Sequence, residues 1–91
     1  MNTYIIYAIL TDSKSGHILN VIKRAEVYNS ADAVIIADML EQRERELIEQ
    51  GARVGDCFNT CYGWKIKQGK WQEQARAIID AGNAGGLHCI R

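Results

Sequence analysis

The chain has 91 residues, nearly half of them hydrophobic, and its 11 acidic residues balance its 11 basic residues. This length predicts one domain with a single core, and zero net charge argues against a general polyanion binder and against an acidic mimic of DNA. No apolar run approaches the roughly 20 residues of a membrane span and no signal-peptide pattern opens the chain, so we expect a cytoplasmic protein.

The first half of the chain predicts two strands and a long helix. Residues 3–10 are rich in aromatic and β-branched side chains on both faces, which is typical of a central strand. Residues 17–28 alternate between apolar and polar side chains, and a lysine on the apolar face, Lys23, predicts either a nearby bulge or a stem that snorkels to the sheet edge. From Ser30, a candidate N-cap, to the stop at Gly51, apolar residues at helical spacing predict one amphipathic helix.

The second half predicts a strand and a shorter helix. Residues 57–67 alternate strictly, and residues 72–81 have a helical pattern that ends at Gly82. Residues 87–90 either add a last short strand or form a tail. The predicted fold is an α+β two-layer sandwich of order β-β-α-β-α(-β), in which a mostly antiparallel three- or four-stranded sheet packs on one long and one short helix; a ferredoxin-like sheet is one alternative topology. One apolar face of the first strand then needs a cover, which a partner or a second copy could provide.

Glu44 stands within the apolar stripe of the long helix, where a leucine would be expected. Three interpretations are open: the helix extends past the sheet and Glu44 is solvated, Glu44 pairs with a cation across an interface, or it is a functional acid. We favour the solvated side chain, because an unpaired buried carboxylate would cost several kcal/mol. The first half of this helix is apolar almost all round and is the expected buried anchor. The charged second half, which includes Leu47, is the expected contact surface.

Three cysteines and a histidine offer the side-chain types of a tetrahedral zinc site: Cys57, Cys61, His88 and Cys89. Their spacing is poor, because a Cys-x3-Cys pair within a strand merely places both thiols on one face. We therefore expect reduced structural thiols and no metal site. A cysteine nucleophile would need His17 or His88 as its base, and neither pairing can be inferred. The glycine-rich residues 82–86 lack the lysine of a phosphate loop and predict a flexible connector. We predict no catalytic residue and no cofactor.

Aromatic and cationic side chains alternate after residue 61 in the most function-like segment of the chain: Tyr62, Trp64, Lys65, Lys67, Lys70 and Trp71. Aromatics among cations can stack bases and hold phosphates. However, strand alternation places the aromatic residues of 62–66 and the lysines on opposite faces. This placement favours aromatic side chains that belong to the core and lysines that are solvated on the other face. A protein-binding face is the third interpretation.

These observations predict a non-enzymatic protein-interaction module that binds and inhibits or regulates a larger protein partner, with homodimerisation possible. Small domains of this size and style occur among phage and mobile-element proteins that inhibit host defence, an analogy of size alone. The alternative is a small nucleic-acid-binding regulator that uses residues 62–71. The candidate partner-binding residues are Glu41, Arg43, Glu44, Leu47, Ile48, Lys65, Lys67, Lys70 and Trp71.

Overall fold

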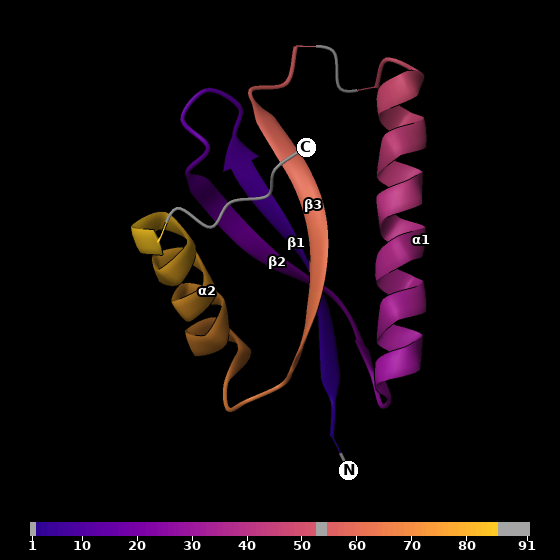
Figure 1. Ribbon diagram of the computed structural model, residues 1–91, viewed down its shortest axis with the longest axis vertical. Helices are drawn as coiled ribbons and strands as arrows, with labels where there is room; N and C mark the ends of the chain where they lie inside the picture. Colours follow the sequence, from indigo (N-terminus) through magenta and orange to yellow (C-terminus); the bar gives the residue numbers. More distant parts are fainter. Residues whose placement is uncertain (1, 53–54, 86–91) are drawn as a thin grey trace.

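The computed structural model describes residues 2–52 and 55–85 and contains three strands and two helices (Figure 1). In chain order these are β1 (Tyr4–Asp12), β2 (Ile18–Val27), α1 (Ser30–Glu49), β3 (Phe58–Ile66) and α2 (Trp71–Gly85). The strands form one antiparallel sheet of order β2-β1-β3. The predicted α+β class, the antiparallel sheet and the order β-β-α-β-α are therefore confirmed. The optional last strand at 87–90 lies outside the described residues.

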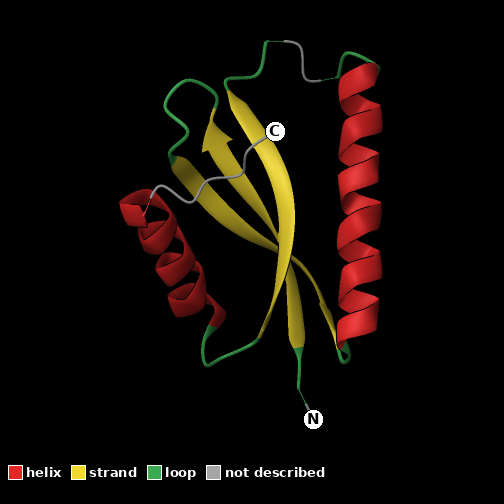
Figure 2. Cartoon of the chain, in the orientation of Figure 1, coloured by secondary structure: helices red, strands yellow, loops and turns green. Residues whose placement is uncertain are grey.

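The two helices lie on opposite sides of the sheet (Figure 2). Successive side chains of a strand point to opposite faces, so Ile5 and Tyr7 of β1 pack with α2 whereas Ile6 packs with α1. The sheet is thus the middle of three layers, which differs from the expected two-layer sandwich. This arrangement explains why β1 is apolar on both faces: each face has its own helix, and β1 needs no partner or second copy to cover it.

Two irregularities change the direction of side chains along β2. The pairing with β1 shifts register twice, and each shift leaves one β2 residue without a β1 partner: Leu19 and Arg24. The shift at Arg24 lies next to Lys23, where the sequence predicts a bulge. Because one extra residue turns the following side chains over, Val21 packs with the α2 cluster whereas Ala25 packs with the α1 cluster. One edge strand thereby contributes to both cores.

The two helices begin and end differently from the sequence pattern. The N-cap of α1 is Asn29 rather than Ser30, because the Asn29 Oδ1 accepts the Asp32 backbone N–H at 2.8 Å. The second helix passes its predicted stop at Gly82 and continues to Gly85, so most of the expected flexible connector is helical. A tertiary contact holds this extension: the Asn83 side chain accepts the Ile18 backbone N–H at 2.7 Å and donates to the Ile18 carbonyl at 3.3 Å.

Candidate interaction surface

We call the contact between α1 and β3 the seam. Glu44, the acidic residue within the apolar stripe of α1, lies in this seam. Glu44 is only 5% exposed, and its Oε1 lies 3.5 Å from the hydroxyl of Tyr62, a long hydrogen bond. The expectation of a solvated Glu44 is therefore wrong. The helix does not extend past the sheet at this point, because Leu47, one turn further on, is still half-buried. Glu44 is a buried structural side chain, and the intramolecular core continues beyond it.

Glu41 holds the same seam from the edge of the sheet. Its Oε1 accepts the backbone N–H of Tyr62 at 3.0 Å, so this amide of the edge strand β3 bonds to α1 rather than to another strand. The opposite edge strand, β2, is interrupted by its two register shifts, and its first residue, Ile18, is bonded by Asn83. Bulges and covered amides are the usual ways to protect sheet edges from added strands. Neither edge therefore offers a long regular row for strand addition by a partner.

A hollow of about 290 Å³ follows the seam and is lined by Glu41, Glu44, Arg45, Ile48, Asn59 and Thr60. Both acidic side chains at this hollow already bond to Tyr62. We interpret them as part of the packing of α1 on β3. Glu41 and Glu44, two of the predicted partner-binding residues, lie in this seam, and Leu47, a third, is half-buried.

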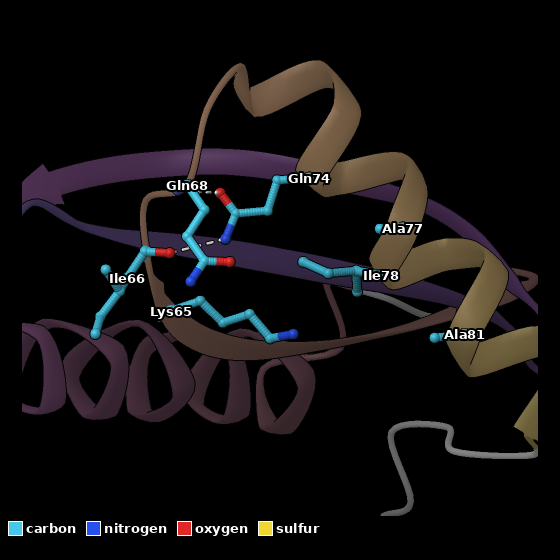
Figure 3. Close-up of a pocket in the computed structure, with 7 residues that line it drawn as sticks. All are labelled: Lys65, Ile66, Gln68, Gln74, Ala77, Ile78 and Ala81. Carbon is cyan, nitrogen blue, oxygen red and sulfur yellow. Dashed lines mark hydrogen bonds between the residues drawn. The ribbon is translucent and has the colours of Figure 1, made fainter.

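A second groove lies between α2 and the end of β3 (Figure 3). Its volume is about 460 Å³, and its lining residues are Lys65, Ile66, Gln68, Gln74, Ala77, Ile78 and Ala81. Gln74 closes one end of the groove: its Nε2 donates to the Ile66 carbonyl at 2.8 Å, and its Oε1 accepts the Gln68 backbone N–H at 3.2 Å. These two bonds attach the start of α2 to the end of β3. Lys65 is the cationic side chain among the lining residues.

The structure divides the aromatic and basic segment between the two faces. Trp64 packs edge-on against Tyr4, with 5.7 Å between ring centres, on the side of α1. Trp71 packs against Tyr7, with 5.9 Å between ring centres, on the side of α2, and is half-buried.

The lysines of this segment lie with α2 or remain exposed. Lys65 lines the groove beside α2, Lys67 lies 3.7 Å from the carboxylate of Glu26, and Lys70 is exposed. The predicted placement of Trp64 and Lys65 on opposite faces of β3 is therefore confirmed. The residues predicted as one cluster do not converge on a single surface.

The two described cysteines differ in burial and in redox state. Cys57 is a free, exposed thiol, whereas Cys61 is buried and disulfide-bonded. The expectation of reduced thiols is therefore wrong for Cys61. His88 and Cys89, the other side chains considered as zinc ligands, lie outside the described residues. Within residues 2–52 and 55–85, no group of three or more acidic, histidine or cysteine side chains could hold a metal ion.

The outward side of α1 carries apolar side chains that the sheet does not cover. Ile35 is 55% exposed and Met39 is 65% exposed, although Ala33 and Ala37 on the opposite side of the helix are buried. We define the outer face of α1 by its exposed residues Val34, Ile35, Asp38, Met39, Gln42, Arg43 and Glu46. A shallow hollow of about 450 Å³ lies on this face around Met39. The exposed apolar side chains of this face are thus on the first half of the helix, which the sequence pattern assigned to the buried anchor.

Sequence reasoning identified one member of this face, Arg43, as a partner-binding residue. The signal for the others was present, because Val34, Ile35 and Met39 lie off the apolar stripe of the helix. In the sequence alone, these three residues favour a first half that is buried all round. The structure shows that α1 packs on the sheet along one side only, so apolar residues off the stripe remain exposed.

No protein-family model matches this chain, and neither a curated protein nor a solved structure is significantly similar to it. Neither helix within the described part of the chain is long and apolar enough to cross a membrane. We therefore infer the function from the surfaces of the molecule.

Proposed function

We propose that this chain is a non-enzymatic interaction module that binds a larger protein through the outer face of α1. The exposure of Ile35 and Met39 carries this proposal, because both side chains leave more than half of their surface in water while the helix is already anchored on its other side. Full burial of an apolar side chain of this size contributes about 1.5–3 kcal/mol. Covering the exposed parts of these two residues would contribute about 2 kcal/mol to binding.

The surroundings of the two residues resemble the usual composition of an interface. Protein interfaces combine an apolar centre with a polar, solvent-accessible rim. Here Asp38, Arg43 and Glu46 surround Met39 and line the hollow beside it. This arrangement favours a partner that presents an apolar side chain within a ring of mixed charge, as a helix or a shallow groove does.

The sheet edges and the lysine segment support other modes of binding less well. Strand addition is disfavoured by the register shifts of β2 and by the bond from Glu41 to the β3 edge. Nucleic-acid binding was the alternative function, and it requires stacking aromatics beside phosphate-binding cations. Trp64 lies on the side of α1 and Lys65 on the side of α2, so we do not propose this alternative.

We further propose that the module acts by covering a functional surface of its partner. One helix face gives a 91-residue chain a contact surface that is separate from its core. Such binding inhibits or regulates a larger protein without any chemistry of its own. Inhibition or regulation of the partner by covering its surface is therefore part of the proposed function.

Affinity capture with the full-length chain tests this proposal. The tagged protein is expressed in the cells that encode it, and captured proteins are compared between wild type and the double variant Ile35→Glu/Met39→Glu. A matched control is Leu19→Glu, because Leu19 is an equally exposed apolar residue, 57% exposed, on β2. We expect a specific larger protein to be captured by wild type and by the control and lost with the double variant, while all three proteins melt within a few degrees of one another. Retention of that protein by the folded double variant would contradict the proposal.

A further inference from the structure

We propose that the outer face of α1 also pairs with the same face of a second copy, with the two helices antiparallel. This inference rests on the proposed function, because it uses the same surface. It gives that surface a second occupant, which a larger partner has to displace. Three features of the helix carry the inference: an exposed apolar side chain, a shallow hollow that a facing side chain can enter, and complementary charges.

The projecting side chain is Ile35, and the hollow lies next to it on the same helix. The hollow around Met39 is lined by Asp38, Met39, Gln42, Arg43 and Glu46. At about 100° per residue, the side chain of Ile35 points within roughly 10° of the mean direction of the four residues 38, 39, 42 and 43. A side chain of a facing helix can enter the space between such lining residues, as a knob enters a hole in helix packing. A two-fold axis therefore lets Ile35 of each copy enter the hollow of the other, in two identical contacts.

This contact sets the register of the two helices and brings opposite charges together. In an antiparallel pair, the sequence numbers of two residues that face each other have a constant sum. When Ile35 of one copy faces the centre of residues 38–43 of the other, this sum is about 75 or 76. Arg43 of one copy then faces Asp32 of the other. Both residues are exposed and lie on the same flank of the helix, within about 20° of each other. The carboxylate of Asp32 is held in place by Asn29, whose Nδ2 donates to Oδ2 at 2.8 Å. The pair would form twice across the two-fold axis.

One feature of the register opposes pairing. The Asp38 side chains of the two copies face each other near the two-fold axis, on the flank opposite to Arg43. Two carboxylates that lie close together repel each other. The helices overlap over residues 30–46, about 24 Å, which buries less than the roughly 800 Å² per partner of a standard interface. The geometry thus predicts a weak dimer that depends on concentration, and a larger partner can displace such a dimer.

Sedimentation equilibrium of the full-length chain tests the register through charge substitutions. We expect wild type to dimerise with a Kd in the micromolar to millimolar range, about 10 µM to 1 mM. Asp38→Asn should tighten the dimer about three- to tenfold, since it removes the repulsion at the axis. Arg43→Glu and Asp32→Lys should each weaken the dimer by a similar factor, and the double variant should recover most of the loss. Arg76→Glu, on the exposed side of α2, is the matched control and should change nothing. Thermal melting confirms that each variant is folded.

A chain that stays monomeric at about 1 mM would overturn the inference. So would a dimer in which Asp38→Asn has no effect and the charge exchange brings no recovery. These failures are distinct from failure of the proposed function. A monomeric chain that still captures a larger protein through Ile35 and Met39 overturns the dimer alone. Loss of the dimer in the Ile35→Glu/Met39→Glu variant, with partner capture retained, overturns the proposed surface for the larger partner.

Discussion

Glu41 of α1 accepts a hydrogen bond from the backbone amide of Tyr62 in β3, with 3.0 Å between the nitrogen and Oε1. A helix side chain thus satisfies an amide of an edge strand that would otherwise be available to another strand. The bond joins residues 21 positions apart and attaches the middle of α1 to the middle of β3. It both stabilises the fold and restricts how the protein can contact others.

Replacing Glu41 tests the energetic contribution of this bond. Glu41→Ala leaves the partly buried amide without this acceptor, and we expect a loss of about 1–3 kcal/mol in the free energy of unfolding. Glu41→Gln retains a carbonyl oxygen at the same place and should lose less than half as much. Urea denaturation measures both variants against Glu49→Ala, an exposed position on the same helix that should lie within about 0.5 kcal/mol of wild type. A loss no larger for Glu41→Ala than for Glu49→Ala would show that the bond contributes nothing.

Glu44 should contribute to stability rather than to binding. Because it is buried beside Tyr62, we expect Glu44→Ala to lower the free energy of unfolding by about 2–4 kcal/mol. A double-mutant cycle with Tyr62→Phe should give a coupling energy of about 0.5 kcal/mol or more. Additive effects of the two substitutions would mean that the 3.5 Å contact between Glu44 and the Tyr62 hydroxyl is not an energetic interaction.

Asn83 should keep the last turn of α2 in place. Its amide accepts the Ile18 backbone N–H and donates to the Ile18 carbonyl, so Asn83→Ala removes two bonds and should cost about 1–3 kcal/mol. Asn83→Asp keeps the acceptor but places a carboxylate near the carbonyl oxygen, and its stability should not exceed that of wild type. Amide exchange of Ile18, followed by NMR, should accelerate in Asn83→Ala. Unchanged protection of Ile18 would contradict this account.

The alkaline limit of stability should depend on Tyr7. This side chain is 6% exposed, and burial raises the pKa of its hydroxyl above the ordinary value of 10.0. A group whose pKa is raised by folding contributes stability below its unfolded pKa, and this contribution is lost as pH rises through the folded pKa. Wild type should therefore lose stability above pH 10 more steeply than Tyr7→Phe. Chemical denaturation between neutral and alkaline pH measures both curves, and parallel curves would contradict the prediction.

The order of elements could be predicted because it depends on local periodicity. The alternation of β3 and the helical spacing of α1 are visible within short windows of sequence. The side of the sheet on which each helix packs is not local information. The apolar pattern of β1 on both faces therefore suggested a missing partner, and the actual cover for one face was α2.

The details that were missed depend on contacts between distant residues. Glu44 was correctly placed on the apolar stripe, but its burial involves Tyr62, 18 positions away. The end of α2 was predicted from Gly82, whereas Asn83 is held by Ile18, 65 positions away. The outer face of α1 has a different explanation: the sequence pattern predicts Ile35 and Met39 to be interior, whereas both are more than half exposed. An apolar residue off the stripe of a helix that packs on one side only is exposed, and Ile35 and Met39 both meet this condition.

Photo-crosslinking from position 39 tests the central claim most directly. A photoreactive phenylalanine derivative replaces Met39 in the full-length chain inside cells, and Gln72, exposed on α2, is the control position. The proposed function predicts a covalent adduct with a specific larger protein from position 39 and none from position 72. Equal adducts from both positions, or no adduct of position 39 with any protein other than a second copy, would contradict it.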